Sequence, residues 1–84
     1  MSYTLILTED DIETIAFVGH RYCWSDQLLS IGVEAGENTI SEPDAWLFSE
    51  AMDADMEGGH SGFPMLDPRS ELIDKLIQFW QDIV

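Results

Sequence analysis

The order of apolar and polar positions along the chain predicts one short strand followed by helices. Residues 3–7 (YTLIL) form an apolar run rich in strand-favouring side chains. Thr8 follows this run, and Asp11 stands three residues later, which is close to the spacing of a helix capping box. Over residues 12–31, apolar side chains then recur with helical spacing on two faces. A helix with two apolar faces has to be covered from both sides, so we expect this one to lie at the centre of the core.

The two faces of this predicted first helix raise two questions about its continuity. Gly19 lies on the first face, where a missing side chain would let a neighbouring backbone come close. Ser25 has the character of a helix cap, so a kink or break near it is the alternative to one continuous helix. Gly32 is expected to end the element, and residues 33–38 to form a loop. The first face holds Ile12, Ile15, Ala16, Gly19, Tyr22 and Cys23, and the second holds Phe17, Trp24, Leu28 and Ile31.

A second helix is expected over residues 42–56. Ser41 can cap its start, and a proline is tolerated at position 43 in the first turn. Thr39 and Ile40, just before this helix, are a candidate strand that could pair with residues 3–7. The positions expected to face inward are Ala45, Phe48, Ala51, Met52 and Met56.

A third helix is expected over residues 69–84, after a cap at Asp67 and a first-turn proline at Pro68. Its broad apolar face consists of Leu72, Ile73, Leu76, Ile77, Phe79, Trp80 and Ile83. The sequence therefore predicts a single α+β domain over residues 1–84 that is mostly helical. Three main helices surround a central first helix, and the short N-terminal strand has a candidate partner before the second helix.

The charge balance is the strongest constraint on partners. Asp and Glu number 17 against three Lys and Arg, which gives a formal net charge of −14 and a pI near 4.1. Such a chain repels nucleic acid and anionic membranes and attracts basic surfaces.

Cys23 is the single cysteine, so no disulfide can form within the chain, and a lone thiol suits a reducing compartment. The sequence shows neither a signal peptide nor an apolar run of membrane-spanning length, so we expect a cytoplasmic protein.

A tryptophan surrounded by carboxylates is the main candidate binding site. On the predicted second helix, Trp46 shares one arc with four acidic residues. Two interpretations are open: Trp46 is covered by a loop and belongs to the core, or it is an exposed anchor for a partner. The four carboxylates are those of Glu42, Glu50, Asp53 and Glu57. A second acidic patch, Glu9, Asp10 and Glu13, lies at the start of the first helix, where it also offsets the helix dipole.

Two candidate metal sites can be compared with known ligand spacings. Asp53, Asp55, Glu57 and the following glycine match the first half of a calcium-binding EF-hand loop, although Pro64 stands where the last ligand, a glutamate, is required. An acidic helix end with a glycine stop is the alternative. A zinc site would need His20, Cys23 and His60 together with a carboxylate.

No nucleotide-binding loop, hydrolase elbow or catalytic cysteine signature is present, and three basic residues offer little polarising charge. We therefore expect a protein that is not an enzyme and has no cofactor.

Carboxylates on a small domain can imitate the phosphates of a duplex, which carries one charge per about 1.7 Å of axis, and can occupy a basic groove meant for nucleic acid. The alternatives are acidity that serves only solubility, a calcium-responsive module, and a homo-oligomer formed through Phe17, Trp24 and Ile31.

In small size, solitary cysteine, strong acidity and lack of enzymatic motifs, the chain resembles the small proteins of phages and mobile elements, some of which are anti-CRISPR or anti-restriction mimics of nucleic acid. This resemblance is compositional and covers the whole chain, and no matched motif carries it. It implies an inhibitor that docks on the nucleic-acid channel of a CRISPR effector or a similar enzyme.

Overall fold

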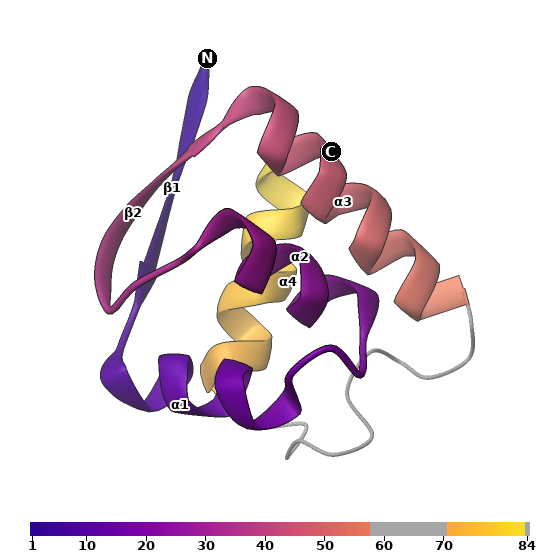
Figure 1. Ribbon diagram of the computed structural model, residues 1–84. Coiled ribbons are helices and arrows are strands. Elements are labelled where there is room, and N and C mark those ends of the chain that lie inside the picture. Colours follow the sequence, from indigo (N-terminus) through magenta and orange to yellow (C-terminus); the bar gives the residue numbers. More distant parts are fainter. Residues whose placement is uncertain (58–70, 84) are drawn as a thin grey trace.

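The computed structural model describes residues 1–57 and 71–83, which form two strands and four helices (Figure 1). In chain order these are β1 (Ser2–Leu7), α1 (Glu9–Val18), α2 (Cys23–Ile31), β2 (Gly36–Ser41), α3 (Glu42–Glu57) and α4 (Glu71–Ile83). This arrangement confirms the predicted α+β class, its mostly helical content and the N-terminal strand. The proposed start of the last helix at Asp67 and Pro68 lies outside the described residues.

The two strands pair antiparallel, and the predicted partnership with Thr39 and Ile40 is confirmed. Tyr3 lies opposite Ile40, and Thr4 lies opposite Thr39. β2 nevertheless begins at Gly36, inside the stretch expected to be a loop. The side chain of Asn38 explains this early start, because its amide nitrogen donates to the carbonyl oxygens of Leu5 at 3.1 Å and Glu34 at 2.9 Å. These bonds hold the turn before β2 against β1.

The predicted first helix is interrupted, and the break lies earlier than Ser25. Gly19 has φ +62°, a conformation that other residues rarely adopt, and its N–H donates to Ile15 O at 2.9 Å, so it ends α1. Tyr22 is extended and precedes the first turn of α2, and its N–H donates to Ser25 Oγ at 3.3 Å. Ser25 therefore acts within the first turn of α2. The interpretation of Gly19 as a close packing contact within a helix was wrong, because a Cβ at this position would lie no closer than 3.8 Å to its nearest neighbour, the local Ala16 O.

The break separates the residues that a continuous helix would have placed on shared faces. Trp24 and Leu28 are fully buried, whereas Phe17 is 69% exposed. Phe17, Trp24 and Ile31 therefore form no common oligomer face, since Trp24 belongs to the core of this chain. Ala16 and Cys23, expected on the first buried face, are exposed. The central helix is thus α2 alone, which packs against α3 and lies in the middle of Figure 1.

The inner faces of α3 and α4 follow the predicted pattern and complete the core. Phe48 of α3 and Phe79 of α4 have ring centroids 5.4 Å apart, and Phe79 also meets Tyr3 of β1 edge to face at 6.3 Å. α4 therefore packs against both α3 and the strand. The buried residues of these two helices are Ala45, Phe48, Ser49, Met52 and Asp55 in α3, and Leu72, Ile73, Leu76, Phe79 and Ile83 in α4.

An ion pair between α4 and the start of α1 joins residues that are distant in sequence. Lys75 Nζ lies 2.7 Å from Asp11 Oδ2, and the side chain of Asp11 is only 8% exposed. Asp11 also completes the predicted capping box, since Thr8 N–H donates to Asp11 Oδ2 at 2.9 Å and Asp11 N–H donates to Thr8 Oγ1 at 3.1 Å. Burial by itself would raise the pKa of Asp11, but the hydrogen bonds from Lys75 and Thr8 and the lysine charge outweigh it and hold that pKa below its usual value.

This depressed pKa predicts how the ion pair responds to acid. The stabilisation is fully present above the pKa that Asp11 has in the unfolded chain, and it is lost as the pH falls through the lower folded-state pKa. Asp11→Asn should lower the free energy of unfolding by about 1–2 kcal/mol at neutral pH, and the difference from wild type should shrink below about pH 4. Urea unfolding across this pH range measures both effects. Asp10→Asn is the matched control, because Asp10 is exposed in the same helical turn, and an equal loss there would contradict the assignment.

Candidate functional site

The orientation of α3 determines which of its side chains can meet a partner. Asp44 N–H donates to Ser41 Oγ at 3.4 Å, so Ser41 caps the helix as expected, with Pro43 in the first turn. Ala45, Phe48 and Met52 are fully buried against the core. The opposite side of the helix therefore faces solvent along its length.

The outward side carries the predicted tryptophan and its carboxylates. Trp46 is 49% exposed, so of the two interpretations the structure favours the exposed one over the core one. Glu42, Glu50, Asp53 and Glu57 are all exposed as well. At 100° per residue these five side chains fall within an arc of about 80° on one side of the helix. We call Glu42, Trp46, Glu50, Asp53 and Glu57 the acidic face of α3.

A second apolar side chain, Leu47, extends this surface and was not foreseen. It is 48% exposed and directly follows Trp46. Its helical angle lies between the buried and the acidic arcs, so periodicity alone does not indicate exposure. Two adjacent, half-exposed apolar side chains beside carboxylates have the composition of an interface anchor with a polar rim.

The charge density of the acidic face sets a limit on what it can imitate. Its four carboxylates lie between the two ends of the 16-residue α3, a distance of about 22 Å along the helix axis. One strand of a DNA duplex carries a phosphate every ~3.4 Å of axis, so α3 alone has about half of that density. The acidic face therefore has fewer charges than a phosphate row of the same length.

The second acidic patch lies elsewhere on the molecule. Glu9, Asp10 and Glu13 are exposed on α1, whose helix packs against α2 rather than α3. In Figure 1, α1 and α3 lie on opposite sides of α2. The structure therefore places the two predicted patches on different helices, with α2 between them.

Asp55 has a structural function that the sequence did not reveal. It is buried on the inner side of α3, and its carboxylate accepts hydrogen bonds from Cys23 N–H at 3.1 Å and Trp24 N–H at 2.9 Å. Both donors belong to the first turn of α2, where backbone N–H groups lack partners within the helix. Asp55 thus caps α2 from a neighbouring helix, and its charge lies at the positive end of the α2 dipole.

This cap changes the interpretation of the calcium candidate. Asp53, Asp55 and Glu57 are helical, and positions two residues apart on a helix point about 200° apart, so the three side chains diverge. Asp55 is moreover engaged by α2. Within residues 1–57 and 71–83 the structure contains no group of three or more His, Cys, Asp or Glu side chains placed to hold a metal ion. In the described structure Asp53, Asp55 and Glu57 therefore belong to an acidic helix end, the alternative to the EF-hand loop, and the remainder of that loop lies outside the described residues.

Cys23 is a ligand of the candidate zinc site and the single thiol of the chain. Its thiol is exposed, contrary to prediction, and His60 lies outside the described residues. His20 Nδ1 is hydrogen bonded to Asp26. The charge of Asp55, together with partial desolvation by neighbouring atoms, raises the pKa of the Cys23 thiol. A helix N-terminus usually lowers a thiol pKa, but here the capping carboxylate reverses that effect, so the thiol is protonated and weakly nucleophilic at neutral pH.

Comparisons with known proteins do not assign this chain to a family. No family model, curated protein or solved structure matches the chain. None of the helices in the described ranges is both long enough and apolar enough to cross a bilayer.

Replacing Asp55 should affect both stability and the thiol. Asp55→Ala removes the partner of two buried N–H groups and should lower the free energy of unfolding by about 2–3 kcal/mol. It should also lower the pKa of Cys23, because the charge of Asp55 is the main cause of its elevation. Urea unfolding and the pH dependence of thiol alkylation by iodoacetamide measure the two effects.

The exposed Asp53 supplies the control for this experiment, since Asp53→Ala removes a carboxylate from the same helix without touching α2. Should Asp55→Ala fail to fold, Asp55→Asn keeps one acceptor and removes the charge, and the thiol pKa can be measured in that variant. An unchanged thiol pKa in a folded Asp55 variant would rule out the assigned cause.

Proposed function

We propose that this chain is a non-enzymatic binding protein that presents the acidic face of α3 to a basic nucleic-acid-binding groove of a partner protein. The observation that carries the proposal is Trp46, about half exposed on a solvent-facing helix and accompanied by four exposed carboxylates. The compositional resemblance to anti-CRISPR and anti-restriction proteins indicates the kind of partner: a CRISPR effector or another enzyme that binds nucleic acid.

Electrostatics supports a basic partner. The formal net charge of −14 steers the chain toward cationic surfaces over about 8–10 Å at physiological salt. Arginine and lysine side chains that hold phosphates can hold carboxylates with the same geometry. The acidic face would therefore compete for the residues that a partner uses to bind nucleic acid.

Trp46 supplies an apolar anchor, which adds affinity that charge alone does not provide. Exposed ion pairs contribute little net affinity, whereas a tryptophan that becomes buried at an interface is among the strongest anchors. Leu47 beside it enlarges the apolar contact. On this proposal, the carboxylates determine the approach and the choice of partner, and Trp46 slows dissociation.

The weak nucleophilicity of Cys23 also favours binding over catalysis. Its thiol pKa is raised, and its neighbour Asp55 is occupied in capping α2. An activated nucleophile would need a lowered thiol pKa or a neighbouring base that is free to accept its proton, and Cys23 and Asp55 provide neither.

Charge reversal on α3 should abolish partner binding. The variant Glu50→Lys, Asp53→Lys, Glu57→Lys replaces three carboxylates on the acidic face, and Trp46→Ala should weaken binding about tenfold or more. The partner is first captured with the wild-type chain and shown to bind labelled nucleic acid. The wild-type chain should then displace this nucleic acid from the partner, and the triple variant should not. Binding should fall steeply with salt, which fluorescence anisotropy measures directly.

The control is a second triple variant with the same change in formal charge as the α3 variant, at exposed positions outside the acidic face. It carries Glu34→Lys, Glu37→Lys and Glu71→Lys. It should retain most of the affinity, with circular dichroism confirming that both triple variants are folded. Equal loss in the two variants would show that overall charge, rather than this face, drives binding. Unchanged affinity in the α3 variant would refute the proposal.

A further inference from the structure

Among the described residues, one edge of β1 has no paired strand, and the proposed α3 surface does not use this edge. The described part of the sheet contains only β1 and β2, so one side of β1 has no strand beside it. Glu42 N–H donates to Met1 O, which extends the strand register by one pair. In an antiparallel ladder the paired residues alternate, so Tyr3 and Leu5 direct their backbone groups to β2, while Thr4 and Ile6 direct theirs to the free edge.

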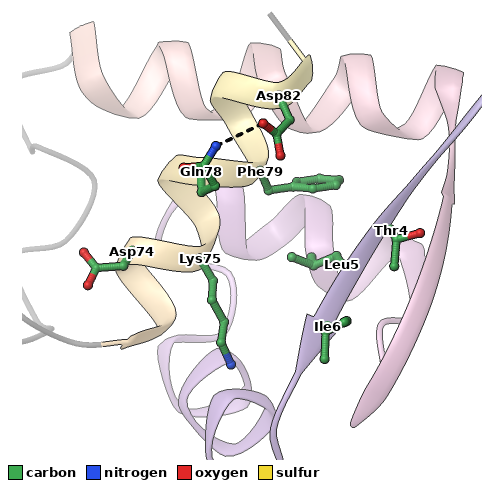
Figure 2. Close-up of a pocket in the computed structure, with 8 residues that line it drawn as sticks. All are labelled: Thr4, Leu5, Ile6, Asp74, Lys75, Gln78, Phe79 and Asp82. Atoms are coloured by element: carbon green, nitrogen blue, oxygen red, sulfur yellow. Dashed lines mark hydrogen bonds between the residues drawn. The ribbon is translucent and has the colours of Figure 1, made fainter.

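A groove runs along this free edge, between β1 and α4. It encloses about 520 Å³ and is lined by Thr4, Leu5 and Ile6 on one side and by five residues of α4 on the other (Figure 2). β1 and α4 run in opposite directions along it (Figure 1). Ile6 is 60% exposed, so the strand edge is accessible from solvent. Phe79 supplies an apolar floor next to Leu5.

The charges around the groove are predominantly negative. Asp82 lies at one end, where Gln78 Nε2 donates to its Oδ1 at 3.0 Å. Asp74 lies on the outer rim toward the other end, and its side chain extends away from β1 (Figure 2). Lys75 also lines the groove, but its ammonium group is held by Asp11 at 2.7 Å. A ligand in the groove therefore meets unpaired backbone groups of β1, an apolar floor and the carboxylate of Asp82, with the Asp74 carboxylate farther out on α4.

We propose that this groove binds an extended, basic peptide segment of a partner protein, which adds to β1 as a further strand. Free N–H and C=O groups at a strand edge are satisfied by the backbone of an added strand, and this contact does not depend on peptide sequence. The carboxylates select for lysine or arginine. The proposal concerns a surface separate from the acidic face of α3 and stands independently of the function proposed above.

Charge favours this occupant over a second copy of the chain. Pairing of β1 with β1 of another copy would bring together two chains that each carry a net charge of −14, with Asp74 and Asp82 of both copies at the new junction. Charged side chains beside an open edge are a common means of preventing such self-pairing. A basic segment would instead be attracted to the same carboxylates.

The positions of the carboxylates indicate the spacing of basic residues in the ligand. Asp74 and Asp82 are eight residues apart on α4, about 12 Å along its axis. An extended strand covers this distance in about four residues, and residues i, i+2 and i+4 share one face. The ligand should therefore carry lysine or arginine at i, beside Asp82, and at i+4, where a long side chain can extend toward Asp74, with an apolar residue at i+2 above Phe79.

A synthetic peptide tests the proposal directly. The probe is a peptide of about nine residues with alternating Thr and Val, Arg at positions i and i+4, and Val at i+2. Anisotropy of a labelled probe should show saturable binding, and amide hydrogen exchange should slow at Thr4 and Ile6. A control probe with Arg at i and i+3, on opposite faces, should bind about fivefold or more weakly.

Variants separate backbone addition from general attraction. Ile6→Pro removes the edge N–H without removing a donor to β2 and should weaken probe binding at least tenfold, whereas Ile6→Thr keeps that N–H and should have a smaller effect. Asp82→Asn should weaken binding about three- to fivefold. If Ile6→Pro fails to fold, N-methylation of the probe backbone tests the same hydrogen bonds with the wild-type chain.

Two outcomes would overturn the proposal: equal affinity for the N-methylated and unmodified probes, or exchange protection confined to residues outside β1. A concentration-dependent dimer in light scattering that Ile6→Pro dissociates would assign the edge to a second copy instead. The triple reversal on α3 should change probe affinity by less than about twofold at physiological salt, so failure here and failure of the α3 proposal are distinguishable.

Discussion

The two hydrogen bonds from the start of α2 to Asp55 are the contact on which the arrangement of helices depends. Cys23 and Trp24 donate to a single buried carboxylate from α3, which satisfies two N–H groups in the first turn of α2. The contact fixes the N-terminus of α2 against the C-terminal part of α3. Because Trp24 follows directly, its ring enters the core at the same point and is fully buried.

Fixing α2 against α3 also decides what α3 shows to solvent. Asp55 shares the inner side of the helix with Met52 and Phe48, so rotation of α3 would break the cap and the apolar packing together. Trp46 is thereby held outward, even though a tryptophan gains much from burial. An exposed aromatic on a helix that cannot rotate is available to a partner without rearrangement, which limits the entropy lost on binding.

Periodicity and capping signals predicted the strand at the N-terminus, its partner, the capping box at Thr8, and the inner faces of α3 and α4. They did not locate the break after Val18, because Gly19 fits a helix face as well as a helix end, and only its positive φ distinguishes the two. For the site, helical spacing predicted which carboxylates accompany Trp46 but left its exposure open. Asp55 and the Asp11–Lys75 pair were missed because their partners are 31 and 64 positions away in sequence, and spacing within one element says nothing about such contacts.

Acidity has different consequences at different places in this molecule. Where carboxylates are buried, at Asp11 and Asp55, each has a specific donor: Lys75 for one, and the first turn of α2 for the other. The remaining surface charge has few internal cations to oppose it, since Lys75 is engaged and the chain has only two arginines besides. Mutual repulsion among those carboxylates lowers the stability of the compact state and opposes self-association at the open edge of β1. A basic partner relieves the repulsion wherever it binds, so the same charge that disfavours a second copy favours a cationic ligand on α3 and in the groove beside β1.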